Sequence, residues 1–247
     1  MVVSIIIASV ITVIFLGFRV SVADKNEKWG VITTLIKAAA SLAVIAIAIT
    51  AIYSGGAKGT GTNRAAIFIV AGLIFGLIGD IVLDLKVVYL KTKEESAYLY
   101  GGMISFGLGH IMYFVGLLLF FGGEVISWSV IGICLAVAAV VAFIMIIAGE
   151  KLMKLDFGKY TIISLAYAFI LLFTTAISIS LWALAKSKGL NNIPLLSMGF
   201  ILFLMSDLVL TSMYFGGRAK DNTLCVVNHA LYYAAQICIA TFVFFMQ

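Results

Sequence analysis

Two aspartates at the ends of matched apolar segments are the residues best placed for chemistry. Residues 72–80 and 199–207 each begin with glycine and end with an acid, Asp80 or Asp207, and a Val-Leu pair follows one residue later in both. An aspartate at the centre of a bilayer costs about 2.5–3.5 kcal/mol on insertion scales, so a membrane-embedded acid indicates a functional site. Two acids in matched contexts strengthen that hypothesis.

The segment that contains Asp80 places four residues on one helical face. Gly72, Gly76, Asp80 and Asp84 recur every four residues. Glycines at this spacing allow a neighbouring backbone to approach closely, so the face is predicted to be buried against protein. Asp80 is then expected to point into the bundle. Asp84 lies one turn nearer the cytoplasmic side, where an acid can also reach headgroups and water.

Two further segments carry histidine and tyrosine inside apolar stretches. His110 and Tyr113 share a face, and an aspartate on the adjacent helix offers the imidazole a partner. Histidine is the side chain best suited to shuttle a proton near neutral pH. A second polar stripe follows the helical i, i+3, i+4, i+7 pattern: His229, Tyr232, Tyr233 and Gln236.

The composition requires these residues to lie in a membrane. The chain is 64% hydrophobic and 11% charged, with one proline in 247 residues, which is too apolar for a soluble core. We predict an all-α, polytopic membrane protein, a single domain over residues 1–247 with eight transmembrane helices. The expected helices cover 2–19, 31–53, 65–85, 97–121, 125–148, 159–185, 194–215 and 224–246. The third and fourth resemble the seventh and eighth (Gly-x7-Asp, then His-x-x-Tyr), which favours a parallel four-plus-four duplication.

Basic residues predict the orientation of the bundle. Eleven follow odd-numbered helices: Arg19, Lys25, Lys28, Lys86, Lys91, Lys93, Lys151, Lys154, Lys159, Arg218 and Lys220. The opposite side carries only Lys58, Arg64, Lys186 and Lys188. By the positive-inside rule, both termini are non-cytoplasmic, in the inner membrane if the source is prokaryotic. The same charges fit contact with anionic membrane lipids and do not indicate a nucleic-acid partner.

Depth suggests that the polar residues converge. At about 1.5 Å per residue from the cytoplasmic ends, Asp80, Asp207, Lys37 and His229 lie roughly 8–10 Å deep, and His110 and Gln236 roughly 18–20 Å deep. Lys37 is either a lysine that snorkels to the interface or a counter-ion for an acid or a phosphate. A pocket open to the cytoplasmic leaflet would collect all of these side chains.

These motifs together resemble the YhhN family, the transmembrane lysoplasmalogenases. The resemblance covers essentially the whole chain: Gly79-Asp80, Gly109-His110 with Tyr113, Ser206-Asp207, Tyr232-Tyr233 with Gln236, and a lysine in the second helix. The family's lysine is typically followed by proline, whereas Ala38 follows Lys37 here.

The resemblance implies hydrolysis of the vinyl ether of a lysophospholipid, without a cofactor, to a fatty aldehyde and a glycerophospho-ethanolamine or glycerophosphocholine. Such cleavage needs one protonated acid and one ionised carboxylate. We expect Asp80 and Asp207 a few ångströms apart as this pair, with His110 orienting or activating water. The expected lipid-binding residues are Lys37, Asp84, Tyr113, His229, Tyr232, Tyr233 and Gln236.

Three alternatives stay open at this point. A zinc hydrolase usually needs several histidines, and this chain has two, so we predict no metal site. A proton-coupled transporter of a small or lipid-like solute would use the same buried Asp, His and Lys. A purely structural scaffold would have to tolerate two unpaired acids without any functional return.

Overall fold

The structure is a computed structural model that describes residues 2–21, 27–55, 60–88, 95–122, 125–186, 193–219 and 221–246. Within these residues it is almost entirely helical, and eight helices are long and apolar enough to cross a membrane, which confirms the predicted fold class. The helices are α1 (Val2–Ser21), α2 (Glu27–Tyr53), α3 (Thr60–Val88), α4 (Glu95–Phe121), α5 (Trp128–Leu152), α6 (Thr161–Lys186), α7 (Ile193–Phe215) and α8 (Asn222–Phe242). Two short 3₁₀ helices, η1 (Gly158–Tyr160) and η2 (Val243–Phe245), precede α6 and follow α8.

The helices follow the predicted apolar windows because a segment in lipid must satisfy its backbone hydrogen bonds internally. Several run a few residues past those windows, since helical hydrogen bonding continues where the sequence becomes polar. Two starts were predicted too early. The sixth helix was expected from residue 159, whereas α6 begins at Thr161, after η1. The fifth helix was expected from residue 125 but begins at Trp128, where the Ser127 hydroxyl caps it by accepting the Val130 N–H at 3.3 Å.

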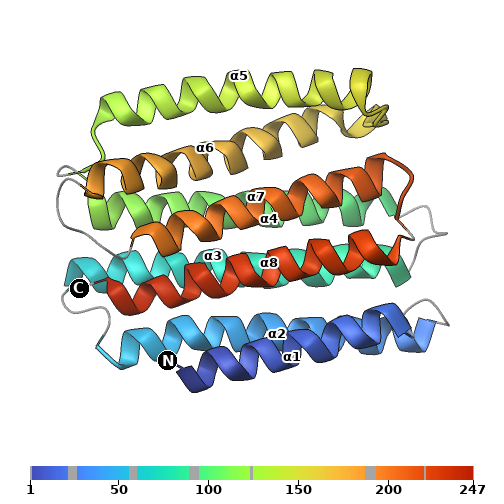
Figure 1. Cartoon of the computed structure of the whole chain (residues 1–247), viewed down its shortest axis with the longest axis horizontal. Helices are drawn as coiled ribbons and strands as arrows, with labels where there is room; N and C mark the ends of the chain where they lie inside the picture. The colour runs from blue at the N-terminus through green and yellow to red at the C-terminus, as the bar shows by residue number, and fades with distance from the viewer. Residues whose placement is uncertain are drawn as a thin grey trace.

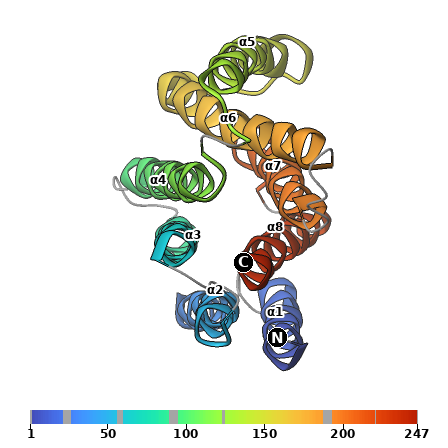
Figure 2. The same ribbon diagram turned by 90° about the vertical axis from the view of Figure 1, so that its left-hand side faces the viewer.

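The eight helices run antiparallel to their chain neighbours, and both termini lie at the same end of the bundle (Figure 1). Viewed along the helices, α4, α3 and α2 form one row and α6, α7, α8 and α1 form the other, with α5 outside α6 (Figure 2). The last turns of α1, α3, α5 and α7 lie at the opposite end from the termini, which we call the basic end. Among the predicted orienting charges, six lie outside the described residues: Lys25, Lys58, Lys91, Lys93, Lys188 and Lys220.

Helix neighbours repeat between the two halves of the chain. In each half, consecutive helices pack together, α1 to α4 and α5 to α8. Across the halves, α2 packs against α8 and α4 packs against α6. A twofold relation between α1–α4 and α5–α8 would produce these two contacts, because it exchanges α2 with α6 and α8 with α4. However, α8 also packs against α1 and α3, whereas the equivalent packing of α4 against α5 and α7 is weaker, so the duplication stays a prediction.

The two His-x-x-Tyr segments nevertheless occupy different heights. A methyl group added to Gly72 would lie 2.9 Å from the carbonyl oxygen of Gly109, and one added to Gly199 would lie 3.1 Å from that of Ala235. The histidine of α4 directly follows Gly109, whereas the histidine of α8 lies six residues before Ala235. The two motifs therefore match in sequence but differ by about two helical turns in register.

Candidate functional site

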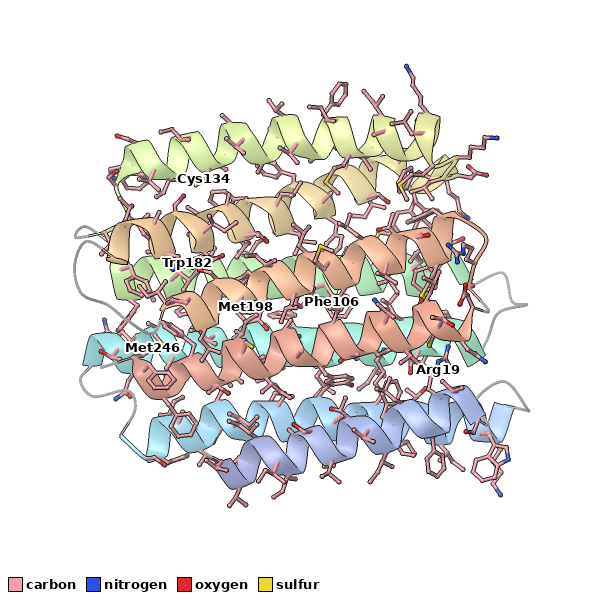
Figure 3. All side chains as sticks on the ribbon, viewed as in Figure 1. Arg19, Phe106, Cys134, Trp182, Met198 and Met246 are labelled. Carbon is pink, nitrogen blue, oxygen red and sulfur yellow. The ribbon has the colours of Figure 1, made fainter. Side chains whose placement is uncertain are left out.

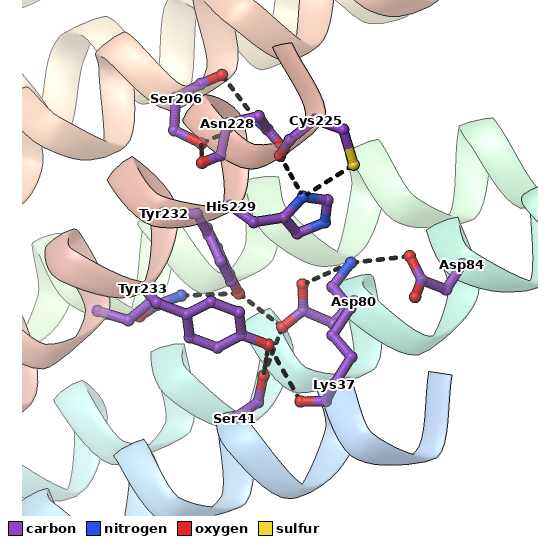
Figure 4. Close-up of polar contacts among 11 residues, drawn as sticks. Lys37, Ser41, Asp80, Asp84, Ser206, Cys225, Asn228, His229, Tyr232 and Tyr233 are labelled. Atoms are coloured by element: carbon purple, nitrogen blue, oxygen red, sulfur yellow. Dashed lines mark hydrogen bonds and ion pairs between the residues drawn. The ribbon is translucent and has the colours of Figure 1, made fainter. Parts of the chain in front are cut away.

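A buried lysine joins two aspartates at the centre of the polar cluster. Lys37 Nζ donates to Asp84 Oδ1 at 2.9 Å and lies 3.3 Å from Asp80 Oδ1 (Figure 4). The three side chains are 6%, 7% and 3% exposed, respectively. Lys37 is therefore the counter-ion of two acids on α3, one of the two roles that its position allowed. Asp84 is not interfacial, because its carboxylate is buried with that of Asp80.

Both oxygens of Asp80 have partners, since Oδ1 faces Lys37 and Oδ2 accepts two hydrogen bonds. Its Oδ2 accepts from Ser41 Oγ at 2.6 Å and from Tyr232 OH at 2.8 Å. Ser41 also shares a hydrogen bond with Tyr233 OH at 3.2 Å, and Tyr233 OH donates to the Lys37 carbonyl at 3.0 Å. These donors come from α2 and α8, on either side of α3. Asp80 is thus held as a carboxylate with its hydrogen-bonding capacity largely satisfied.

A chain of amide and hydroxyl groups extends this network toward the termini. Tyr113 OH donates to Gln236 Oε1 at 3.1 Å, and Gln236 Nε2 donates to Tyr232 OH at 3.0 Å. Since Tyr232 in turn donates to Asp80, three predicted site residues form one directed chain that ends on this carboxylate. The chain also joins α4, α8 and α3.

His229 lies beside the cluster but bonds elsewhere. Its Nδ1 lies 2.8 Å from the carbonyl oxygen of Cys225, which can only accept, so Nδ1 carries the hydrogen (Figure 4). Its ring packs edge-on against Phe15, with the centroids 5.0 Å apart. His229 and Asp84 interact electrostatically without a direct hydrogen bond.

Asp207 occupies a different environment. It lies in the wall of a cavity of about 310 Å³ and accepts a hydrogen bond from Tyr167 OH of α6. The cavity is lined mainly by apolar side chains of α3 to α7, among them Leu83, Met103, Phe106, Met145, Leu171, Leu204 and Phe215. Its volume is at the lower end of the range for small-molecule sites, roughly 300–1,000 Å³.

The expected Asp80–Asp207 pair is therefore wrong as a direct contact. Asp80 bonds to Lys37 and side chains of α2 and α8, while Asp207 bonds to α6. Phe106, near the middle of the bundle (Figure 3), lines the cavity and packs edge-on against Tyr232, with ring centroids 5.9 Å apart, and the Tyr232 hydroxyl bonds to Asp80. The matched contexts give both acids a similar depth, but each faces the neighbours of its own half of the bundle.

His110 also differs from its expected place. Both ring nitrogens are buried and have no hydrogen-bond partner, and neither aspartate contacts the ring. The ring is enclosed by aromatic side chains: Tyr113, Phe200 and Phe203, with centroids 5.6, 5.9 and 4.6 Å away. The cause is the register of α3 and α4: Gly109 packs opposite Gly72, two turns from Asp80. His110 is therefore paired with neither aspartate, and its role in orienting or activating water stays a prediction.

Sequence reasoning missed three participants. Ser41 follows Lys37 by four residues and so shares its face of α2, a spacing that could have identified it. Tyr167 lies on α6, and nothing in its local sequence marks it as the partner of Asp207. Tyr214 lies two turns after Asp207 on α7, which could have placed it in the same cavity.

In the part of the chain that the structure describes, no three His, Cys, Asp or Glu side chains lie together as metal ligands. Neither a curated protein nor a solved structure matches this chain. A family model matches residues 32–243, from α2 to the end of α8, and so covers both acidic sites. The chain belongs to the YhhN family.

Proposed function

We propose that this protein is a membrane hydrolase that cleaves the vinyl ether of lysoplasmalogens to a fatty aldehyde and a glycerophospho-alcohol. Membership of the YhhN family is compatible with this activity. The observation that carries the proposal is an apolar cavity with one carboxyl group in its wall, Asp207, supported by the Tyr167 hydroxyl. An acid beside an apolar ligand is what protonation of a carbon–carbon double bond requires.

The cavity fits a single-chain lipid. Side chains of α4 and α5 both line it, whereas α5 packs against α6 and lies apart from α4 (Figure 2). We infer that this side of the cavity faces the bilayer, so a hydrocarbon chain can extend into lipid while its polar end stays inside. Such an arrangement admits a substrate without removing its chain from an apolar environment.

The chemistry divides between the two acidic sites. Among the described residues, no lysine, arginine or histidine lines the cavity, so no cation there stabilises an ionised Asp207. Asp207 is therefore the acid that delivers a proton to the β-carbon of the vinyl ether, leaving an oxocarbenium ion. Water adds to that ion and returns a proton to the Asp207 carboxylate. The hemiacetal then collapses to aldehyde and a free glycerol hydroxyl, which balances the reaction.

Asp80 has a different role in this scheme. Its two oxygens are bound by Lys37, Ser41 and Tyr232, so neither is free to face the substrate. We assign it, with Lys37 and Asp84, to a charged cluster next to the polar end of the lipid. This replaces the paired-acid mechanism that the sequence suggested.

The test uses purified protein, a lysoplasmalogen and its saturated ether analogue, with aldehyde as the readout. We expect aldehyde from the vinyl ether alone. Asp207→Asn should fold normally and lose turnover by about 10² or more, the scale of a positioned acid. Glu150→Gln is the matched control, since Glu150 is exposed near the basic end of α5. No aldehyde from folded wild-type protein, or full turnover by Asp207→Asn, would refute the proposal.

A further inference from the structure

One oxygen of the charged cluster has no partner. Asp84 Oδ1 accepts from Lys37, but Asp84 Oδ2 is buried without a hydrogen bond, in a residue only 5% exposed. A buried carboxylate oxygen without a donor costs free energy, so such an atom calls for a ligand or a functional reason. Asp80, one turn away, shows no such deficit.

The charges around this oxygen do not remove the deficit. Lys37, Asp80 and Asp84 together carry a formal charge of −1, and Arg19 of α1 acts on Asp84 from a longer distance. The group therefore contains two cations and two carboxylates. The formal charges of the four cancel, but Asp84 is the one with a free acceptor, and a buried carboxylate oxygen favours a cationic group that can donate hydrogen bonds to it.

Tyr214 links the cluster to the cavity. Its side chain lines the cavity and also interacts electrostatically with Lys37, Asp84 and Arg19. On α7, Asp207, Thr211 and Tyr214 all line the cavity and lie on one face, leading from the acid toward the basic end. The seven residues from Asp207 to Tyr214 correspond to about 10 Å along the helix axis.

We propose that Asp84 binds the primary ammonium group of an ethanolamine headgroup. The proposal rests on the proposed function for one point, the position of the ether oxygen beside Asp207. Nine bonds separate that oxygen from the headgroup nitrogen, about 11 Å at roughly 1.2 Å of extension per bond. This length matches the separation between Asp207 and Tyr214. Because Asp84 Oδ2 lacks a donor, a primary ammonium satisfies it, whereas the trimethylammonium of choline has no N–H to give.

Binding of saturated ether lysolipids tests this without any turnover. Three probes share one alkyl chain and carry phosphoethanolamine, phosphocholine or phosphate alone, and their affinities are measured with purified protein in micelles of one detergent. We expect wild type to bind the ethanolamine probe about tenfold more tightly than the choline probe, and the phosphate probe most weakly. Asp84→Asn should lose the ethanolamine preference, while Glu150→Gln should keep it.

Retained binding of the choline probe shows that Asp84→Asn is folded, and we expect the fold to persist because Lys37 keeps Asp80 as a partner. Equal affinities in wild type, no binding of any probe, or an undiminished preference in Asp84→Asn would each overturn the ammonium site. If the preference is found but no aldehyde forms from a vinyl ether, the ammonium site stands and the hydrolase proposal fails.

Discussion

Replacement of Lys37 by methionine isolates the energetics of the charged cluster. The substitution keeps the length of the side chain and removes its charge, leaving Asp80 and Asp84 buried without their shared counter-ion. Two carboxylates one turn apart on α3 then repel each other across an apolar interior. We expect Lys37→Met to be among the most destabilising single changes in the bundle.

The distances set the size of the effect. At an effective dielectric constant of about 20, unit charges 2.9 and 3.3 Å apart attract by about 6 and about 5 kcal/mol. Desolvation of the lysine offsets much of this attraction. Removal of one partner from a buried ion pair typically costs about 3–5 kcal/mol, which is the loss in the free energy of unfolding that we expect.

A double-mutant cycle makes the measurement specific. Unfolding is followed by denaturant titration in detergent micelles for wild type, Lys37→Met, Asp84→Asn and the double variant. Because Asp84→Asn removes one of the stranded charges, the double variant should be more stable than additivity predicts, by about 1–3 kcal/mol. Lys151→Met, at an exposed lysine near the basic end, should change stability by less than about 0.5 kcal/mol. A loss below about 1 kcal/mol for Lys37→Met, or strict additivity, would show that the cluster is not an ion pair.

Three further perturbations test other parts of the structure. Gly72→Ala should lower the free energy of unfolding by about 1–3 kcal/mol, because the added methyl collides with the Tyr113 ring and with the Gly109 carbonyl. In the control Gly132→Ala on α5, the methyl meets no atom within 4 Å and should not destabilise the protein. Equal melting of the two variants would contradict the α3–α4 packing. Asp221 caps α8, and the Leu224 N–H and the Arg218 guanidinium hold the pKa of its carboxyl group below the usual value. The stabilisation from this cap is therefore present above the ordinary aspartate pKa and is lost as the pH falls through the lowered one. Thermal melting of Asp221→Asn should accordingly be less sensitive to acid than that of wild type. Reporters fused to either terminus should be non-cytoplasmic, and a cytoplasmic signal at either end would reverse the orientation that the basic residues predict.

The sequence was informative about depth and much less so about direction. Eight apolar windows predicted the helices because bilayer thickness fixes how many residues a span needs. The four-residue spacing of Gly72, Gly76, Asp80 and Asp84 predicted a face buried against protein, and the structure buries both acids there. Each of these conclusions follows from one helix at a time.

The arrangement between helices could not be predicted in the same way. Asp80 and Asp207 end matched segments, yet which neighbour each one faces depends on the rotation of α3 and α7, which a local motif does not fix. The two His-x-x-Tyr motifs do not occupy equivalent positions for a related reason, since the glycine contacts give α3–α4 and α7–α8 different registers. Tyr167 became the partner of Asp207 only through the packing of α6 on α7.

The separation of α4 from α5 beside the cavity changes how concentration should be expressed for any ligand of this site. A lipid that enters from the side of the bundle approaches by diffusion in two dimensions, at its mole fraction in the surrounding lipid or detergent. Inert amphiphile added at constant total ligand then lowers occupancy, although the bulk molarity is unchanged. Saturation curves should therefore coincide between preparations when plotted against mole fraction and diverge when plotted against molarity.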